Sequence, residues 1–151
     1  VAKRFQAFGA ETTGFDIHTN DTSGFNHMDL TENFRGRVGE FDVVVVTAPL
    51  LPSTRGLISR EVLLTMKQNA ILVNIARGGL IDEQAMCEVF DERIYLFAAL
   101  DVFETEPLSA NSPLWTIENV AVSPHNSFVS DGNNARMFTV LYQNLKSFIE
   151  Q

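Results

Sequence analysis

The sequence predicts an α/β protein whose core is a doubly wound parallel sheet. Apolar runs rich in β-branched residues recur along the chain, and segments with helical periodicity alternate with them. The runs are apolar at successive positions, which is typical of strands buried on both faces of a sheet. Because parallel strands are joined by crossover connections, we expect helices to cover both faces.

The N-terminal quarter is predicted to contain one helix and one strand. Residues 1–8 are apolar at positions 1, 2, 5 and 8, which is a helical spacing, and Gly9 suits the end of such a helix. Residues 12–17, TTGFDI, are interpreted as a short strand that ends on Asp16. Residues 18–40 are polar with scattered glycines, so we predict no regular element there.

The middle of the chain alternates between strands and a short helix. Residues 41–49, FDVVVVTAP, are predicted to form a strand that is closed by Pro49, which has no N–H to donate to a sheet. Residues 59–67 begin with Ser59 as a helix N-cap and end on a lysine, so they are predicted to be helical. Residues 70–76, AILVNIA, are the next predicted strand.

The C-terminal half continues the same alternation. Residues 81–92 are predicted to form a helix with Asp82 as N-cap and with an apolar face made of Ala85, Met86, Val89 and Phe90. Residues 96–102 and 119–124 are two further strands. Residues 134–150 are predicted to form the last helix, whose stripe consists of Met137, Val140, Leu141, Asn144, Leu145, Phe148 and Ile149.

Composition narrows the classes of partner. The 151 residues include 19 acidic and 11 basic side chains, a net charge of −8, which disfavours nucleic acid and anionic membranes as partners. No apolar stretch approaches the roughly 18 residues of a membrane-spanning helix. The single Cys87 cannot form an internal disulfide, so we expect a cytoplasmic protein in which Cys87 packs within a helix. No metal site is predicted.

Polar residues follow the predicted strands where each strand ends. They are Asp16, Thr47, Asn74 with Arg77, Asp101 with Glu106, and Ser123 with His125. In open parallel sheets, ligands bind beyond the carboxyl ends of the strands. An imidazole exchanges protons near neutral pH, a neighbouring carboxylate orients it, and a guanidinium matches a carboxylate ligand. Arg77, Glu106 and His125 therefore form a workable acid–base set, and we expect them to converge on one cleft.

Four motifs carry a resemblance to a known family. They are TAPLLPSTRGLIS (47–59), MKQNAILVNIARGGLIDEQAM (66–86), AALDVFETEPL (98–108) and SPLWTIENVAVSPHNS (112–127). Together they resemble the NAD-binding domain of the D-isomer-specific 2-hydroxyacid dehydrogenases, which implies a Rossmann-like fold. The resemblance extends over almost the whole chain, with the motifs in the same order.

The resemblance implies a reaction and catalytic residues for it. An enzyme of this family transfers a hydride reversibly between NADH and a 2-oxo acid, giving a D-2-hydroxyacid. By this resemblance His125 is the proton donor and acceptor, Glu106 pairs with His125, and Arg77 binds the substrate. The fixed charge of Arg77 would then follow a buried strand because the substrate anion meets it there.

The resemblance also implies residues that bind the cofactor. Asp16 matches the acidic residue that holds the adenosine ribose, and its charge would repel a 2′-phosphate, so NAD is expected rather than NADP. Ala48 and Pro49 match the loop on the adenosine side, and Thr54 lies near the pyrophosphate. The nicotinamide side is matched by Ile75 and Ala76 through their backbone, by Arg77, and by Asp101 at the carboxamide.

Other features of the family are missing from these residues. No G-x-G-x-x-G turn precedes residue 1, and the family's substrate-binding domain has no counterpart, so residues 1–151 are interpreted as a partial NAD-binding domain, incomplete at its N-terminus. We therefore expect these residues alone to be inactive, to bind no NAD and to fold without cooperativity, because a central strand would be absent. We expect the full-length protein to be a homodimer.

Several alternatives stay open. The substrate could be lactate-like, a branched 2-oxo acid, glyoxylate or hydroxypyruvate, or phosphoglycerate. The function could instead be that of an NAD-sensing module of the corepressor type, or of an inactive remnant. Among residues without an assigned role, His18 and His27 are expected to be solvated. Trp115 is expected to pack beneath the loop of His125, with lining of the substrate pocket as the alternative.

Overall fold

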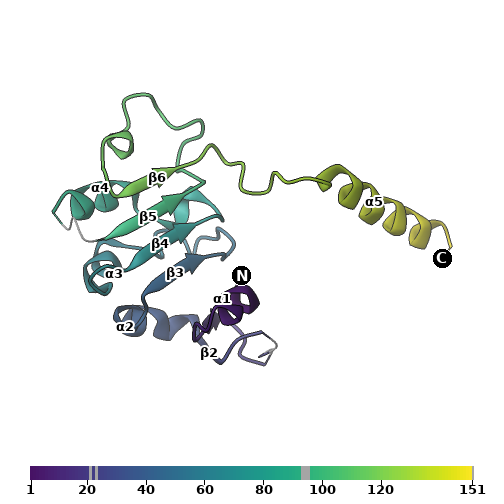
Figure 1. Ribbon diagram of the computed structural model, residues 1–151, viewed down its shortest axis with the longest axis horizontal. Helices are drawn as coiled ribbons and strands as arrows, with labels where there is room; N and C mark the ends of the chain where they lie inside the picture. The colour runs from purple at the N-terminus through teal and green to yellow at the C-terminus, as the bar shows by residue number, and fades with distance from the viewer. Residues whose placement is uncertain (21, 23, 93–95, 151) are drawn as a thin grey trace.

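Two parallel sheets organise the chain, which the computed structural model describes at residues 1–20, 22, 24–92 and 96–150 (Figure 1). The first sheet pairs β1 (Thr13–Asp16) with β2 (His27–Leu30). The second has the order β3-β4-β5-β6 and consists of β3 (Val43–Val46), β4 (Ile71–Asn74), β5 (Phe97–Leu100) and β6 (Val120–Val122). All pairings are parallel, so the predicted α/β class is confirmed.

Among the described residues, α-helices separate β2 from β3, β3 from β4, and β4 from β5, and two more lie near the ends of the chain. They are α1 (Ala2–Ala7), α2 (Phe34–Arg37), α3 (Arg60–Thr65), α4 (Glu83–Glu92) and α5 (Asn133–Ile149). The two predicted N-caps are confirmed: Ser59 Oγ accepts from the Val62 N–H at 3.4 Å, and Asp82 Oδ1 accepts from the Ala85 N–H at 2.9 Å. None of the described helices has the length and apolarity needed to cross a membrane.

One face of the four-stranded sheet is tightly packed. Along β3, β4 and β5 the inward side chains are buried, and they share one core cluster with residues of α3 and α4. The core members on these five elements are Val44, Val46, Leu72, Ala98, Leu100, Val62, Leu63, Met86, Val89 and Phe90. The face predicted for residues 81–92 is therefore confirmed, since Ala85, Met86, Val89 and Phe90 are all buried.

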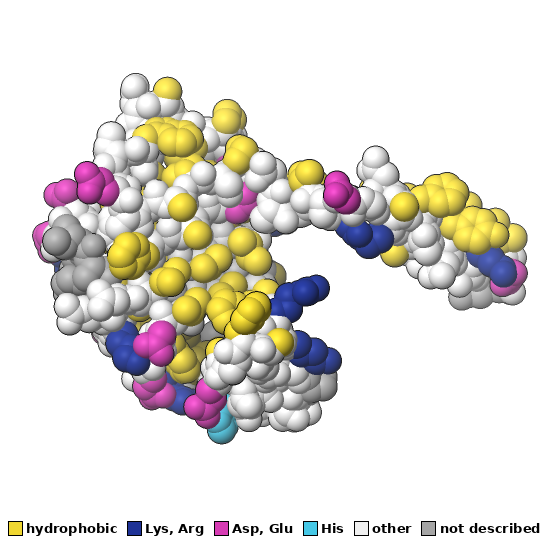
Figure 2. All heavy atoms as spheres, viewed as in Figure 1, with side chains coloured by type: hydrophobic (Ala, Val, Ile, Leu, Met, Phe, Trp, Pro, Cys, Tyr) yellow, Lys and Arg dark blue, Asp and Glu magenta, His cyan; other side chains and the backbone are white. Residues whose placement is uncertain are grey.

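The other face of the same sheet is partly open, which corrects the expectation that helices cover both faces. Ile71 on β4 is 40% exposed and Phe97 on β5 is 47% exposed. Hydrophobic side chains gather over the strands on the face turned toward the viewer in Figure 2. The strands are apolar at successive positions, which predicted that both faces of the sheet would be buried. Among the described residues, α3 and α4 pack on one face, and the other face remains partly exposed.

The last helix stands away from both sheets, which corrects a second expectation. The stripe predicted for residues 134–150 has no packing partner among the described residues, and no residue of α5 is buried. Phe148, for example, is 77% exposed and Leu145 is 59% exposed. Figures 1 and 2 show α5 at the end of an extended segment, with hydrophobic side chains along it.

Residues 18–40 are more regular than predicted. Besides β2 they contain α2, flanked by the 3₁₀ turns Thr31–Asn33 and Val38–Glu40. Phe34 and Val38 from this stretch are buried in the main core. Charged residues interrupt the apolar pattern in this region, so periodicity did not predict its elements. These charges pair with one another: Arg37 contacts Asp29 at 2.7 Å and Glu40 at 2.8 Å.

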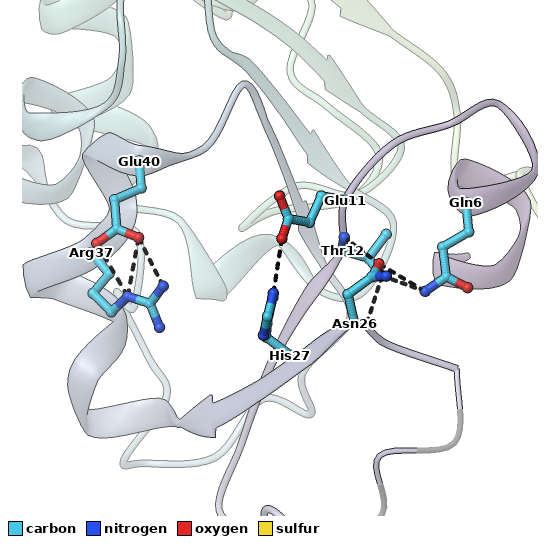
Figure 3. A network of polar contacts seen from close by, with 7 residues as sticks. All are labelled: Gln6, Glu11, Thr12, Asn26, His27, Arg37 and Glu40. Atoms are coloured by element: carbon cyan, nitrogen blue, oxygen red, sulfur yellow. Dashed lines mark hydrogen bonds and ion pairs between the residues drawn. The ribbon is translucent and has the colours of Figure 1, made fainter.

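Polar contacts hold α1 against the two-stranded sheet (Figure 3). Gln6 Nε2 donates to Thr12 Oγ1 at 2.8 Å and to Asn26 Oδ1 at 3.0 Å. Asn26 Oδ1 also accepts from the Thr12 N–H at 2.9 Å. Towards the larger sheet, the ring of Phe15 meets Phe34 and Phe41 edge-on, at centroid distances of 5.4 and 5.6 Å. Among the described strands none pairs across the two sheets, and aromatic packing joins them.

The register of the larger sheet brings its carboxyl ends into one row. Val46 on β3 is paired with Asn74 on β4, Asn74 with Leu100 on β5, and Leu100 with Val122 on β6. The segments that follow these four residues therefore leave the sheet at the same edge. Arg77, Glu106 and His125 belong to three of those segments.

Candidate active site

The loop after β4 presents Arg77, and the side chain of Asn74 shapes that loop. Asn74 is fully buried, and its Nδ2 donates to the Arg77 carbonyl at 3.0 Å while its Oδ1 accepts from the Ala76 N–H at 3.1 Å. The guanidinium of Arg77 is further steadied by a 2.7 Å bond from Nη1 to the Ala76 carbonyl. A buried amide therefore fixes the turn, while the charged end of Arg77 stays exposed.

Gly78 brings the loops after β4 and β5 together. A Cβ at this position would lie 1.8 Å from the carbonyl carbon of Phe103 and 2.3 Å from the nitrogen of Glu104. No side chain fits there without moving the backbone, so glycine is required by a close approach of two chain segments. Gly79 is crowded by side chains and not by backbone, since a Cβ there would lie 3.2 Å from a methyl carbon of Leu50.

Glu106 and His125 form a direct pair. His125 Nδ1 lies 2.7 Å from Glu106 Oε2, within the hydrogen-bond reach that the sequence predicted. The pKa of Glu106 is lowered, first by the hydrogen bond with His125 and then by the bond that its Oε1 accepts from the Phe103 N–H. An ionised carboxylate can only accept, so Nδ1 carries the hydrogen and Nε2 is the nitrogen left for proton exchange.

The buried carboxylate of Asp101 holds the loop that carries His125. Asp101 is 3% exposed and accepts from Ser123 Oγ at 2.6 Å, from the Asn126 N–H at 2.9 Å and from the Ser127 N–H at 2.9 Å. Burial alone would raise the pKa of Asp101, but these hydrogen bonds outweigh it and hold the pKa well below its usual range.

The backbone of His125 has an unusual conformation, and Asp101 bonds the residues around it. Its φ is 51°, in the left-handed region that non-glycine residues enter rarely. The residues that bond Asp101 lie on both sides of His125 in the chain, so the carboxylate stabilises a conformation that an isolated peptide would populate little. By resemblance Asp101 is expected to bind the cofactor alone, and its contact with the loop of His125 is not predicted by the sequence.

Arg77, Glu106 and His125 line one cavity of about 320 Å³ at the carboxyl edge of the larger sheet. The predicted convergence of these three side chains is therefore confirmed. Leu50, Gly79, Phe103 and Arg55 contribute to the same wall. Arg77 carries a positive charge beside an imidazole whose Nδ1 is held by a carboxylate, an arrangement that can bind an anion and exchange a proton with it.

A second cavity of about 600 Å³ adjoins the first, and Arg77 lines both. Ala48, Pro49 and Ala76, three of the residues that the resemblance assigns to the cofactor, line this second cavity together with Thr47 and Leu50. Four of its six lining residues are apolar, which suits a flat aromatic ring beside them.

The remaining residues assigned to the cofactor lie elsewhere. Asp16 ends β1 with an exposed carboxylate, whose Oδ1 accepts from the His18 N–H at 3.2 Å. Thr54 Oγ1 donates to the Pro49 carbonyl at 2.7 Å and accepts from the Leu51 N–H, so it closes a turn of the protein itself. Ile75 follows β4, is 40% exposed and lines neither cavity.

Two expectations about packing also have outcomes. Cys87 on α4 is a free, partly buried thiol packed against the core, as predicted. Trp115 is 53% exposed, bonds the Ser109 carbonyl through Nε1 at 2.8 Å and lines neither cavity. Its neighbour Leu114, 1% exposed, supplies the core contact that was expected of Trp115.

Comparisons with known proteins identify the family. Residues 1–127 match the family model described as D-isomer specific 2-hydroxyacid dehydrogenase, NAD binding domain, and the chain belongs to this family. D-3-phosphoglycerate dehydrogenase of Methanocaldococcus jannaschii is 37% identical over 150 residues, which are 99% of this chain and 28% of that protein. (S)-Sulfolactate dehydrogenase of Chromohalobacter salexigens is 33% identical over 97% of this chain and 48% of that protein.

Solved structures agree in fold. A D-isomer specific 2-hydroxyacid dehydrogenase family protein from Aeromonas salmonicida matches with a TM-score of 0.87 and 31% identity, over 99% of this chain and 47% of that one. Similar structures hold either cofactor. One from Lactobacillus delbrueckii, at 25% identity and TM-score 0.84, is an NAD complex, covering 99% of this chain and 49% of that one. One from Xanthobacter autotrophicus contains NADPH. It matches with 35% identity and a TM-score of 0.75, over 82% of this chain and 39% of that one. The chain thus spans half or less of the length of these relatives.

Proposed function

We propose that this chain is part of the NAD-binding domain of a D-2-hydroxyacid dehydrogenase, with the substrate-binding domain outside these residues. The enzyme would reduce a 2-oxo acid to a D-2-hydroxyacid and run in reverse. The observation that carries the proposal is the cavity in which Arg77 faces the hydrogen-bonded pair of Glu106 and His125. Membership of the family supports the reaction class.

Each of the three side chains has a defined part in the proposed reaction. The fork of Arg77 binds the substrate carboxylate and orients the adjacent 2-oxo group. His125 gives the proton from Nε2 to the carbonyl oxygen, and takes it back in the reverse direction. Glu106 keeps Nδ1 protonated and stabilises the imidazolium from which the proton is transferred. Bound NADH supplies the hydride that reaches the same carbonyl carbon.

The cofactor is proposed to be NAD, held across the second cavity. Ala48, Pro49 and Ala76 would form the wall next to the nicotinamide ring and its ribose, consistent with their position in that cavity. The exposed carboxylate of Asp16 would accept from the adenosine ribose hydroxyls and repel a 2′-phosphate.

Four further residues would complete the cofactor site by resemblance. Ile75 and Arg77 would contribute on the nicotinamide side, and Thr54 would lie near the pyrophosphate. Asp101 would accept a hydrogen bond from the carboxamide. Its carboxylate already accepts three hydrogen bonds, so at most one lone pair is left for the cofactor.

The relatives are named for two chemical classes of substrate, which differ by a second anionic group. The D-3-phosphoglycerate and (S)-sulfolactate dehydrogenases among the relatives are named for acids that carry a second anionic group. Others are named for glyoxylate and hydroxypyruvate, which carry none. All are named as dehydrogenases or reductases, so the corepressor alternative gains no support. We also propose a cytoplasmic location, because Cys87 is the single cysteine of the sequence. A homodimer is proposed for the full-length protein on the basis of the family resemblance.

Turnover by the natural full-length protein tests the proposal. NADH oxidation is followed with a panel of 2-oxo acids, and oxidation of the two enantiomers of each product is compared in the reverse direction. We expect reduction of at least one 2-oxo acid and oxidation of its D-hydroxyacid alone. A properly folded full-length protein that binds NADH but reduces no member of the panel would refute the dehydrogenase proposal.

A further inference from the structure

A second guanidinium in the proposed active-site cavity has no role in the reaction described above. Arg55 lines the same cavity as Arg77 and His125. It does not line the neighbouring cavity of Ala48, Pro49 and Ala76. Arg55 therefore lines the cavity proposed for the acid and not the one proposed for the cofactor.

The position of Arg55 is set by backbone bonds to the segment that follows Arg77. The Gly56 N–H donates to the Gly79 carbonyl at 2.9 Å, and the Ile58 N–H donates to the Leu80 carbonyl at 2.9 Å. Gly79 leaves the guanidinium room, because a Cβ at this position would lie 3.0 Å from Arg55 Nη1. Two segments distant in sequence thus hold two arginines at one wall.

The guanidinium of Arg55 has no acceptor within the described part of the chain. Arg77 donates to a carbonyl, and Arg37 and Arg60 face carboxylates, but no hydrogen bond or ion pair engages the side chain of Arg55. A guanidinium held over a cavity offers a fork of N–H donors that fits an oxyanion. The carboxylate of a 2-oxo acid needs only one such fork, which Arg77 provides.

We propose that Arg55 is a specificity-determining residue that binds a second anionic group, a phosphate or sulfonate, at the far end of the 2-oxo acid. This inference rests on the proposed dehydrogenase function and selects between its two substrate classes. A three-carbon acid that is anionic at both ends would meet Arg77 with its carboxylate and Arg55 with its tetrahedral group.

The opposing charge in the cavity is that of Glu104. The other carboxylate there, Glu106, is engaged by His125 and by the Phe103 N–H. The backbone N–H of Glu104 donates to the Glu83 carboxylate, which fixes the main chain while the exposed side chain of Glu104 stays at the cavity wall. Its charge would weaken binding of a dianionic acid, so removing it should act in the opposite direction to removing Arg55.

The test compares matched pairs of substrates in the natural full-length protein. The pairs are 3-phosphohydroxypyruvate with hydroxypyruvate, and 3-sulfopyruvate with pyruvate, each differing by the second anionic group. In at least one pair, we expect the wild type to prefer the member with the second anionic group by about 10-fold or more in kcat/KM. Arg55→Gln should lower that preference about 10–100-fold, mainly through KM, which is the usual range for a charge-assisted bond. The two pairs distinguish phosphate from sulfonate.

Three further variants sharpen the result. Arg55→Lys keeps the charge but loses the fork, so an intermediate preference is expected. Glu104→Gln should raise kcat/KM for the member with the second anionic group. Arg60→Gln removes an equal charge on α3, where Arg60 faces Glu88 at 3.9 Å and lines neither cavity, and should leave the preference unchanged. Thermal melting of each variant verifies that it is folded.

The outcomes separate the inference from the function on which it rests. The role of Arg55 is overturned if the wild type reduces hydroxypyruvate and pyruvate with the same kcat/KM as their partners that carry a second anionic group. It is also overturned if Arg55→Gln lowers kcat/KM equally for both members of a pair. Absence of all turnover refutes the dehydrogenase proposal instead. The inference about Arg55 is then decided by calorimetric titration of the wild type and of Arg55→Gln, with D-3-phosphoglycerate and D-glycerate in separate experiments. Only D-3-phosphoglycerate should bind more weakly to Arg55→Gln than to the wild type.

Discussion

The carboxyl edge of the four-stranded sheet and the end of the β1–β2 sheet are built in contrasting ways. At the larger sheet, buried Asn74 and Asp101 fix the loops that present Arg77 and His125. At the smaller sheet, Asp16 is exposed and its carboxylate accepts one 3.2 Å bond from the adjacent chain. The groups proposed to meet the reacting atoms are held by buried partners, whereas the group proposed to select the cofactor stands at an exposed position.

The contrast also extends to how the two regions are held together. The larger sheet shares a continuous apolar core with α3 and α4. The smaller sheet is held to α1 by side-chain hydrogen bonds among Gln6, Thr12 and Asn26 (Figure 3). Substitutions at the first region should therefore affect chemistry and stability strongly, and substitutions at the second should affect selectivity or little at all. The predictions below proceed from the largest expected effect to the smallest.

The largest effect is expected at His125. His125→Ala in the full-length protein should lower kcat by about 10²–10⁴, the usual contribution of a positioned acid, because His125 is the one imidazole among the described residues that line the cavity. Asp16→Ala should leave kcat at saturating NADH nearly unchanged. Steady-state kinetics of both variants measures the difference between the two regions. A His125→Ala enzyme with the kcat of the wild type would remove His125 from the mechanism.

The next effect concerns the buried carboxylate of Asp101. Asp101→Asn replaces one acceptor oxygen by an NH₂ group that faces a backbone N–H, and should cost about 1–3 kcal/mol of unfolding free energy at pH 7. Since the pKa of Asp101 is lowered in the folded state, its stabilisation is complete above the unfolded value of about 3.9 and is lost as the pH falls through the folded value.

Urea unfolding at a series of pH values measures this effect. The gap in unfolding free energy between wild type and Asp101→Asn should be constant from about pH 7 to pH 5 and should shrink on further acidification. Ser109→Ala, at a hydroxyl remote from Asp101 in the loop before Trp115, serves as a control without such a pH dependence. A gap that is absent at pH 7, or that widens in acid, would contradict the role of Asp101 as an ionised anchor.

A smaller effect is expected at Asp16. Asp16→Ala should shift the ratio of kcat/KM for NADH over NADPH by about 10-fold toward NADPH, equivalent to about 1.4 kcal/mol of lost discrimination. Asp16→Asn keeps the size of the side chain and should shift the ratio in the same direction, because the charge provides the repulsion. Similar structures hold either cofactor, so the choice is made by local residues. A wild type that already accepts NADPH equally would show that Asp16 does not discriminate.

How far sequence alone could reach is illustrated by α4 and α5. Both were predicted from helical periodicity, and both exist. On α4 the apolar face is buried, with Phe90 at 1%, whereas on α5 Phe148 is 77% exposed. Periodicity shows which side chains share a face, because it depends only on the geometry of the helix. It does not show what covers that face, because this depends on packing with other segments.

The candidate site shows the same division. Arg77, Glu106 and His125 could be located from strand ends and motifs, since carboxyl ends of parallel strands share an edge. The anchoring by Asn74 and Asp101 could not, because it depends on hydrogen bonds between loops whose conformation has no periodic signal. The strand β2 was missed for a related reason: its HMDL sequence is short and partly polar, and it forms through pairing with β1.

The smallest effect is expected at the exposed contact between His27 and Glu11 beside the β1–β2 sheet. His27 Nε2 lies 2.8 Å from Glu11 Oε1, but the two side chains are 60% and 76% exposed (Figure 3). Water solvates both partners before and after the contact forms, so such a pair contributes between about 0 and 1 kcal/mol. His27→Gln should therefore change the unfolding free energy of the full-length protein by less than about 0.5 kcal/mol at pH 7. Urea unfolding of this variant beside Asp101→Asn gives the contrast directly. A loss at His27 as large as that at Asp101 would show that the smaller sheet depends on its surface charges, and the distinction between the two regions would then fail.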